Sequence, residues 1–472
     1  MMKHYQTTAV GEHRGSPRLW LQGENLAHAG FSPGCRFDLL VESGTLKLVL
    51  NDEGKRTVSA KTRGNRAFPV IDINSREELA PIARFGWVRI LITGQTILIL
   101  PLASEERRLE RLERAAGKMQ DGDPLDMGSL SHGGGILSHA VHTGLFLEGV
   151  DSRLRFANEI RGELLDHARD ANDAWEPDTI SLAAPLQELA FDRDALGGLP
   201  AVDILEAGLP CSGASVSGRS KRGLALPEDH PEVGHLVVPF MSLVAQVNPL
   251  VVILENVLLY QSSASASIIR TLMRDFGYDT HECVLRGREF GALEDRDRYC
   301  LLAVTRGVAF DLDQLVRPEV GPARLGDVLE EVASDDSRWS AMAGLKAKME
   351  RDIEAGKGFR MQVFDAASSR IGTITKGYAK VRSTDPKIRH PDNPDLLRQL
   401  MPVEHARVKQ VPEHLVDGLS DTVAHEVLGQ SVVYQPFVAV GALVARALKV
   451  WCAKLETLTS SDAGTLSRTV CG

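Results

Sequence analysis

The sequence predicts an α/β fold preceded by a small all-β domain. Two apolar, β-branched runs, residues 202–207 and 250–254, have the length of buried strands, and each leads into a loop. A glycine cluster at residues 133–135 precedes an amphipathic stretch at residues 136–146, as in a strand–turn–helix unit. Residues 18–102 instead contain short strands separated by turns. We therefore expect two architectures in one chain.

Composition is that of a globular protein with two or three domains. The chain has 472 residues, 43% hydrophobic and 25% charged. Its net charge of −9 means that any nucleic-acid contact must come from local basic patches. The six cysteines are scattered without a CxxC pair, which predicts a reducing compartment and neither a metal site nor a disulfide framework. The N-terminus lacks a signal-peptide core, and the apolar stretch 432–444 is too short to span a bilayer. We expect a cytoplasmic protein without a membrane anchor.

The first domain, residues 1–103, is predicted to be a small β domain. Strands are expected at residues 18–21, 35–41, 45–50, 87–92 and 96–101, with hairpin turns at residues 42–44 and 93–95. Residues 21–34 resemble the opening of SymE/AbrB-type β-barrels, a family of small nucleic-acid-binding modules and toxins. The resemblance implies nucleic-acid binding. A module that only packs on the rest of the chain, or forms a dimer, is an equal alternative.

A charged helical linker is expected at residues 104–127. Leucines three residues apart stand among paired opposite charges in residues 104–118, a pattern typical of a solvated helix with one narrow apolar stripe. Residues 120–124 contain Gly and Pro and break the chain, so the domain boundary is predicted there.

A cysteine and a carboxyl group follow the two apolar strands. Cys211 stands between Pro210 and a run of small residues, while Glu255 and Asn256 end the second strand. Parallel strands of an open α/β sheet bring their carboxyl ends to one edge, so Cys211 and Glu255 should lie side by side. A thiol beside a carboxyl group suits attack on an electron-poor ring. The alternative is a buried structural thiol.

The loop after the cysteine favours the nucleophile. Residues 216–224 are small and basic, and Ser215, Arg219, Lys221 and Arg222 could contact a nucleic-acid backbone. The alternative is an ordinary solvated loop.

Five short motifs in one order resemble the DNA cytosine-5 methyltransferase family. The resemblance covers roughly residues 128–455 and rests on Gly133-Gly134-Gly135, Pro210-Cys211, Glu255-Asn256-Val257, Arg296-Asp297-Arg298 and Gly429-Gln430-Ser431-Val432. It implies a Rossmann-like, S-adenosylmethionine-dependent catalytic domain at residues 128–305 and a target-recognition region at residues 306–396. The C-terminal part of the catalytic domain would follow at residues 397–458, with a tail at residues 459–472.

The resemblance also implies a cofactor site. Its residues would be Leu130, Gly134, Gly135, Glu159, Pro210, Gln430, Ser431 and Val432. Glu159 would bind the ribose hydroxyls, a role that also suits an acid after the strand following a glycine-rich loop. The chain departs from the family at Leu130 (aromatic in the family), His132 (glycine) and Gln430 (asparagine). The family's adenine-contacting acid has no clear counterpart.

The implied chemistry is methyl transfer to carbon 5 of a cytosine flipped out of duplex DNA. Cys211 would add to carbon 6, Glu255 would protonate or hydrogen-bond ring nitrogen 3, and Asn256 would orient the glutamate and pin the loop. Arg296 and Arg298 alternate with Asp297 on a strand and should face one side, supporting the base and the cysteine loop.

Duplex DNA would be read by a basic segment of the recognition region. Residues 370–390 contain six Lys or Arg and one acid. Thr373, Lys376, Tyr378 and Lys380 match the family's recognition stretch and are the candidate contacts, with one short recognition sequence expected. Two alternatives stay open: a catalytically silent DNA-binding relative and an RNA cytosine-5 methyltransferase of the same fold. A restriction endonuclease partner is also left open.

Overall fold

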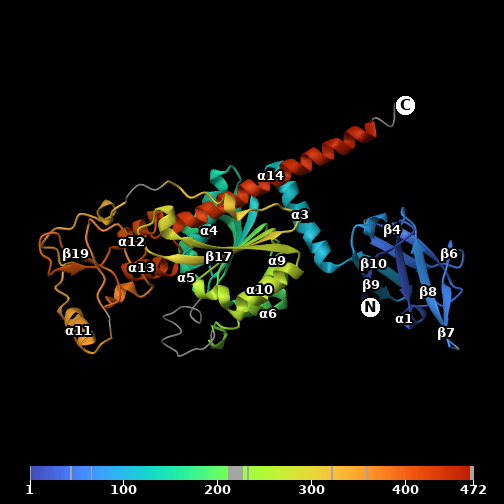
Figure 1. Ribbon diagram of the computed structural model, residues 1–472, viewed down its shortest axis with the longest axis horizontal. Helices are drawn as coiled ribbons and strands as arrows, with labels where there is room; N and C mark the ends of the chain where they lie inside the picture. Colours follow the sequence, from blue (N-terminus) through green and yellow to red (C-terminus); the bar gives the residue numbers. More distant parts are fainter. Residues whose placement is uncertain are drawn as a thin grey trace. The chain divides into compact units, whose positions relative to one another are not determined.

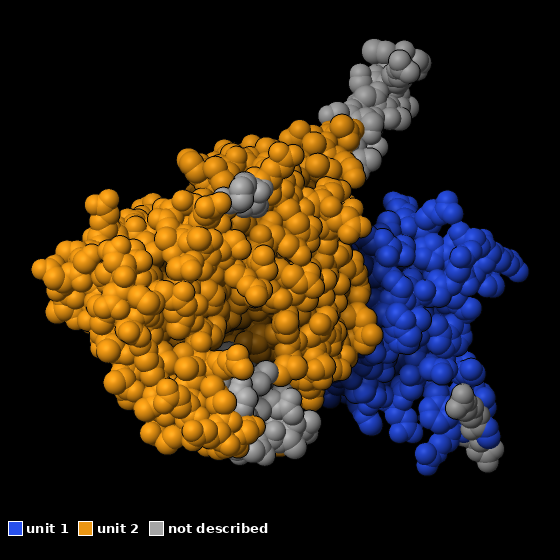
Figure 2. Space-filling view, turned by 60° about the vertical axis from the view of Figure 1, so that its left-hand side comes forward, with its two compact units in different colours: residues 1–110 blue, residues 111–472 orange. Residues whose placement is uncertain are grey.

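The computed structural model describes residues 2–42, 45–64, 66–210, 227–230, 233–319, 323–357 and 360–467. It divides the chain into two compact units, residues 1–110 and residues 111–472, coloured blue and orange in Figure 2. Each unit has its own hydrophobic core.

Unit 1 is the predicted all-β domain. It has a six-stranded sheet in the order β1-β9-β10-β5-β4-β6 and a four-stranded sheet in the order β2-β3-β8-β7. The strands are β1 (Met2–Ala9), β2 (Gly11–His13), β3 (Ser16–Gln22), β4 (Arg36–Glu42), β5 (Thr45–Leu50), β6 (Arg56–Thr57), β7 (Ser59–Arg63), β8 (Arg66–Asn74), β9 (Trp87–Thr93) and β10 (Thr96–Pro101). Short helices α1 (Glu24–His28) and α2 (Ala80–Ala83) connect them. The two predicted hairpins are β4–β5 and β9–β10, whereas β1, β2, β6, β7 and β8 were not predicted.

Unit 2 is built on one seven-stranded sheet in the order β13-β12-β11-β14-β15-β17-β16. Its strands are β11 (Leu125–Leu130), β12 (Ser152–Asn158), β13 (Trp175–Leu182), β14 (Ile204–Gly208), β15 (Val251–Asn256), β16 (Tyr278–Arg286) and β17 (Asp297–Thr305). The first five are parallel, and β17 runs antiparallel to both of its neighbours. The carboxyl ends of β11, β12, β14 and β15 therefore share one edge.

Helices cover both faces of this sheet, as the α/β prediction required (Figure 1). One face carries α4 (Ile136–Leu147), α5 (Gly162–Ala171), α13 (Asp421–Gln430) and α14 (Tyr434–Ser467). The other carries α6 (Leu186–Phe191), α7 (Arg193–Gly198), α9 (Val237–Val247) and α10 (Ala264–Asp275). Within β15, Val251 and Ile253 join the first core while Val252 and Leu254 join the second. Because both faces are buried, the strand reads as a continuous apolar run.

Helices α4 and α14 cross at two glycines. A Cβ on Gly144 would lie 2.1 Å from the Val438 carbonyl oxygen, and one on Gly441 would lie 2.4 Å from the Val141 carbonyl oxygen. The residues 434–457 in α14 are apolar enough and long enough to cross a membrane, but 61% of that window is buried. This burial is typical of the core helix of a globular domain.

Helix α3 (Ala103–Asp121) contains the predicted linker helix, and its second half belongs to unit 2. Arg111 is 1% exposed, stacks on the Tyr278 ring and donates hydrogen bonds to Thr305 Oγ1 and to the Phe276 and Gly277 carbonyl oxygens. The structure thus moves the boundary from residues 120–124 to Glu110, because this arginine is bound inside the second unit.

Two basic side chains in the same half of α3 lie next to Asp203, just before β14. Arg114 and Lys118 both pair with the buried carboxylate of Asp203. Charged residues of the expected solvated helix are therefore used as anchors.

The segment predicted to be the target-recognition region, residues 306–396, forms a small structure together with the residues that follow it. It contains α11 (Ala343–Glu354) and a three-stranded sheet of β18 (Val363–Phe364), β19 (Lys387–Arg389) and β20 (Leu397–Arg398). Helix α12 (Pro402–Val408) follows. A separate apolar cluster that includes Ile371, Ile374 and Tyr378 fills its interior.

Candidate functional site

The ends of β14 and β15 form the centre of the candidate site. The parallel register puts Gly208 directly opposite Glu255. A Cβ on Gly208 would lie 3.6 Å from Glu255 Oε2, so the glycine leaves the carboxyl group open on that side. Leu209 and Pro210 then lead to Cys211, which lies outside the described residues together with Ser215, Arg219, Lys221 and Arg222.

Glu255 is held from its other side by Arg298. Arg298 Nε lies 2.7 Å from Glu255 Oε1, and each side chain is 14% exposed. Because Arg298 stands on the antiparallel neighbour β17, the sheet itself fixes this pair. One carboxylate oxygen is bound and the other faces Gly208.

Asn256 fixes the chain that leads to the cysteine. It is buried, and its Nδ2 donates to the Leu209 carbonyl oxygen at 3.2 Å. Its Oδ1 accepts a hydrogen bond from the Val257 amide at 2.9 Å. These two bonds support the prediction that Asn256 holds the start of the cysteine loop. Among the described residues, Asn256 and Glu255 share no hydrogen bond that would orient the glutamate.

Arg296 and Arg298 have different partners, and the expectation that both face one side stays a prediction. Arg296 precedes β17, is buried, and donates to the Gly429 carbonyl oxygen at 3.1 Å and to the Ile374 carbonyl oxygen at 3.4 Å. Gly429 is near the end of α13, where carbonyl groups lack helical partners and attract a cation. Arg296 therefore joins the segment around Ile374 to the end of α13.

A buried ion group surrounds Arg296. Glu294, in place of the family's glutamine, lies 3.5 Å from Arg296 and 3.1 Å from Lys409. Burial alone would raise the pKa of Glu294, but the charges of Lys409 and Arg296 outweigh it and lower that pKa. Burial, reinforced by Arg296, lowers the pKa of Lys409 to about 7.

The glycine-rich loop turns from β11 into α4. Ser131, Gly133 and Gly135 have φ values of 57°, 57° and 79°, in the left-handed region. Gly134 has no room for a side chain, since a Cβ there would lie 2.5 Å from a methyl carbon of Val427 in α13. Glu159 follows β12 as predicted, and its Oε2 accepts a hydrogen bond from the Gly133 amide at 2.9 Å.

His132, the departure from the family loop, is part of the interior. Its Nδ1 is 2.7 Å from Ser129 Oγ, and Trp175 Nε1 donates to its Nε2 at 3.4 Å. Burial lowers the pKa of His132 to about 3, so the imidazole is neutral. The loop accommodates the larger side chain by turning it inward.

Residues expected to complete the cofactor site differ in exposure. Leu130 is fully buried in the core between the sheet and α9, and Val432 is buried in the opposite core. Gln430 is exposed, and Ser431 Oγ donates to the Leu428 carbonyl oxygen at the end of α13. A Cβ on Gly429 would lie 2.4 Å from the Lys376 amide nitrogen, so glycine permits the recognition segment to approach this helix.

The candidate DNA contacts divide into exposed and buried residues. Thr373, Lys376 and Lys380 are exposed, and Thr373 Oγ1 donates to the Asp295 carbonyl oxygen. Tyr378 is 0% exposed, and its hydroxyl donates to the Pro386 carbonyl oxygen and accepts from the Leu400 amide. The prediction that Tyr378 contacts DNA is corrected: this ring is a core residue of the recognition region.

Glu206 is a buried acid that the sequence analysis did not single out. It lies on β14, level with Ser129 of β11, and is 1% exposed. Burial raises its pKa to about 8, a hydrogen bond with Ser129 opposes this, and the charge of Glu255 adds to it. Its Oε1 has no hydrogen-bond partner among the described residues. The signal was an acid inside the apolar run 202–207.

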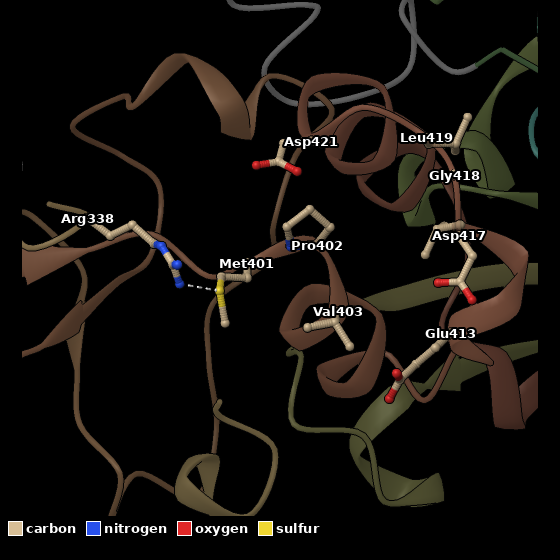
Figure 3. A pocket seen from close by; sticks show the side chains of 10 residues that line it. Arg338, Met401, Pro402, Val403, Glu413, Asp417, Gly418, Leu419 and Asp421 are labelled. Carbon is tan, nitrogen blue, oxygen red and sulfur yellow. Dashed lines mark hydrogen bonds between the residues drawn. The ribbon is translucent and has the colours of Figure 1, made fainter. Parts of the chain in front are cut away.

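A separate pocket of about 410 Å³ lies beside α12 and α13 (Figure 3). Glu413, Asp417 and Asp421 line it together with Arg338, whose Nη1 lies 2.9 Å from Met401 Sδ. None of the predicted site residues that the structure describes lines this pocket.

Comparison with protein families matches residues 181–445 to the C-5 cytosine-specific DNA methylase family. The Type II methyltransferase M.NlaX of Neisseria lactamica is 30% identical over 244 residues, which covers 50% of this chain and 73% of that protein. The Type II methyltransferase M1.ScrFI of Lactococcus lactis subsp. cremoris is 26% identical over 244 residues, covering 50% of this chain. The match spans only 60% of the length of M1.ScrFI.

Solved structures share the fold of unit 2. The S. pombe Dnmt2 methyltransferase superimposes with a TM-score of 0.53 at 18% identity, over 69% of this chain and 99% of its own. The Entamoeba histolytica methyltransferase EhMeth gives 0.52 at 15% identity, over 69% and 98%. With more than half of its 472 residues matched by the family, and 73% of M.NlaX covered, the chain belongs to the C-5 cytosine-specific DNA methylase family.

Proposed function

We propose that this chain is an S-adenosylmethionine-dependent DNA cytosine-5 methyltransferase acting on a cytosine flipped out of a short duplex recognition sequence. The observation that carries the proposal is Glu255. Its carboxyl group is fixed by Arg298 on one side, faces Gly208 on the other, and stands where β14 leads within three residues to Cys211. We expect Cys211, three residues after Gly208, to act on the same ring as Glu255.

The proposed reaction uses the two side chains in sequence. The Cys211 thiolate adds to carbon 6 of cytosine while Glu255 donates a proton or hydrogen bond to ring nitrogen 3, which makes carbon 5 nucleophilic. S-adenosylmethionine supplies the methyl group that carbon 5 accepts. A base then takes the carbon 5 proton, the ring double bond re-forms, and the carbon–sulfur bond breaks to free the Cys211 thiolate. Asn256 holds the start of the cysteine loop throughout.

The residues around the glycine loop fit this cofactor. Gly133 has open space where a Cβ would stand, and the carboxylate of Glu159 lies against the same loop. We assign cofactor contacts to this loop, to Glu159 and to the turn at Gln430 and Ser431. The inward position of His132 keeps the loop surface free of its imidazole.

Duplex DNA is the proposed macromolecular substrate. Exposed Thr373, Lys376 and Lys380 supply the described part of the contact surface, and Figure 2 shows unit 2 hollowed on the face in view. The relatives are named Type II methyltransferases, which supports the proposal of a restriction endonuclease partner that reads the same sequence. The proposed place of action is the cytoplasm.

The test is genome-wide mapping of 5-methylcytosine in a bacterial host that has no cytosine methylation of its own. Expression of the wild type is expected to give a methylated consensus that disappears with Cys211→Ala. Cys283→Ala is the matched control, because this half-buried thiol lies on β16 at the sheet edge. It should methylate like the wild type.

Two other outcomes identify the rival functions. Duplex DNA binding without methylation by folded wild-type protein would identify a catalytically silent relative. Methyl transfer to structured RNA in preference to duplex DNA, measured in direct competition, would identify an RNA enzyme. Either result overturns the proposal.

For unit 1 we propose nucleic-acid binding of the kind found in small SymE/AbrB-type modules. The supporting observation is an exposed face of the four-stranded sheet, where the Arg18 guanidinium lies 4.6 Å and the Lys61 ammonium 5.8 Å from the Trp20 ring centroid. Aromatic rings beside cations bind single-stranded nucleic acid by stacking. Trp20→Ala in the full chain is expected to weaken binding of a single-stranded oligonucleotide. Unchanged affinity together with loss of a dimer would favour the dimerisation role.

A further inference from the structure

Two histidines and one aspartate from three segments of unit 2 lie close together. His139 is in the second turn of α4, Asp173 follows α5, and His414 lies in the short helix η7 (Glu413–Leu415). One ligand atom from each lies within 4.8 Å of the other two. We propose that His139, Asp173 and His414 bind a zinc ion. The sequence analysis predicted no metal site because the chain has no CxxC pair. This cluster has no sequence motif, since its three residues are far apart in the chain.

The orientation of His139 is already fixed. Its side chain is 7% exposed, and its Nδ1 is 2.6 Å from the Tyr434 hydroxyl, which also bonds Thr143 Oγ1 at 2.7 Å. Nε2 then faces the carboxylate of Asp173 at 3.8 Å. A metal-binding histidine ordinarily has its second ring nitrogen bonded in this way, which sets the ring and the tautomer.

The other two positions are braced by the backbone. His167 on α5 hydrogen-bonds the Leu415 carbonyl oxygen at 2.9 Å and so fastens η7 to α5. Asn172, next to Asp173, donates to the Gly135 carbonyl oxygen and accepts from the Ala174 amide. The three segments that carry the ligands are thus tied together by bonds outside the ligand set, in addition to the His139–Asp173 pair.

Ligand chemistry selects the ion. Two imidazoles and a carboxylate suit zinc, whose bonds are about 2.0–2.2 Å and whose tetrahedral ligands therefore stand about 3.4 Å apart. The ligand atoms lie within 4.8 Å of one another, so the widest separation must close by at most about 1.4 Å. Asp173 and His414 are exposed and can make this movement, and the exposed side leaves the fourth position to water. A hard ion such as Mg²⁺ prefers an all-oxygen set and should bind poorly.

Zinc at this position would connect η7, which carries His414, to α4, the helix that begins at the glycine loop. The test is a zinc titration of the full chain, first stripped with a chelator, in competition with a chromophoric chelator. We expect one zinc per chain that His414→Ala weakens by at least tenfold, and Tyr434→Phe by about tenfold because His139 loses its orienting bond. His235→Ala is the matched control, an exposed histidine outside the cluster, and should bind as the wild type does.

Two readouts keep the proposal separable from thiol binding and from misfolding. Zinc should raise the melting temperature of the wild type and of His235→Ala but not that of His414→Ala, while all three melt alike without metal. Cobalt in place of zinc should show ligand-field bands without a thiolate charge-transfer band. Equal zinc affinity in the wild type and His414→Ala, or a thiolate band, would overturn the proposal.

Discussion

Replacing Glu206 with glutamine should make unit 2 more stable, and increasingly so as the pH rises. The carboxyl group of Glu206 is buried on β14, and burial raises its pKa from 4.5 to about 8. Between these values the folded protein holds a proton that the unfolded chain releases. The free energy of unfolding is therefore highest below pH 4.5, where Glu206 is protonated in both states, and it falls as the pH rises toward 8. Glutamine keeps the shape and a polar group for Ser129 without this loss.

The size of the effect follows from the two pKa values. The linkage relation gives a loss of about 2 kcal/mol by pH 6 and about 4 kcal/mol by pH 7.5. The stability difference between Glu206→Gln and the wild type should thus widen by about 2 kcal/mol over this interval. A single fully buried carboxyl group would then account for a large fraction of a typical domain stability.

Hydrogen exchange of the β14 amides is the appropriate assay because it reports opening of this core independently of unit 1. Rates would be corrected for intrinsic exchange at each pH and measured for the wild type, Glu206→Gln and the control Glu188→Gln. Glu188 is an exposed acid on α6, and its variant should follow the wild type at both pH values. A stability difference that stays constant from pH 6 to pH 7.5 would refute the reasoning, because it would mean that Glu206 does not carry the extra proton.

Three further variants test other parts of the structure. Gly144→Ala should destabilise unit 2 by about 1–3 kcal/mol, since its methyl group would meet the Val438 carbonyl at the α4–α14 crossing; the measurement is thermal unfolding. Arg111→Met should cost about 3 kcal/mol or more, because the buried carbonyl groups that it binds lose a charged donor; amide exchange in β16 and β17 reports it. Arg298→Gln should lower methyl transfer by about 10²-fold with the fold intact, because Glu255 loses its charged partner; single-turnover kinetics measure this.

Each of these variants has a matched control. Gly197→Ala lies on a helix with open space around it and should be neutral or slightly stabilising. Arg108→Met removes a surface ion pair with Glu105 and should cost less than about 1 kcal/mol. Arg286→Gln removes an exposed ion pair at the end of β16 and should leave turnover unchanged. If a control matches its test variant, the contact assigned to the test residue does not cause the effect.

The sequence analysis correctly predicted those relations that follow from parallel strands ending at one edge of a sheet. Apolar runs at residues 202–207 and 250–254 became β14 and β15, and their parallel register alone puts Gly208 beside Glu255. Glu159 lies against the glycine loop for the same reason, since β12 ends next to β11. These relations depend on local patterns and on one rule about parallel sheets.

The same reasoning did not predict the partners of residues whose contacts are distant in the sequence. Arg296 donates hydrogen bonds to carbonyl groups about 80 and 130 residues later in the chain, and no local pattern identifies these partners. Tyr378 looks like a DNA contact in a basic segment, yet it is one of eight buried residues that form a separate apolar core. Arg111 sits in a run of surface charges, and nothing local distinguishes it from its neighbours. The positions of such residues depend on partners that are distant in the sequence, and a local pattern does not reveal these partners.

The packing of α14 on α4 has a consequence for biosynthesis. The residues that complete the core around the glycine loop are made almost 300 positions after the loop itself, so a ribosome must finish most of unit 2 before that face of the sheet can close. Until then Val141, Leu145 and the apolar side of β11 and β15 are exposed on the nascent chain. Such late closure slows folding and favours aggregation of unfinished chains. Production of the protein should therefore improve with slower translation or added chaperone, and truncation before α14 should yield insoluble chains.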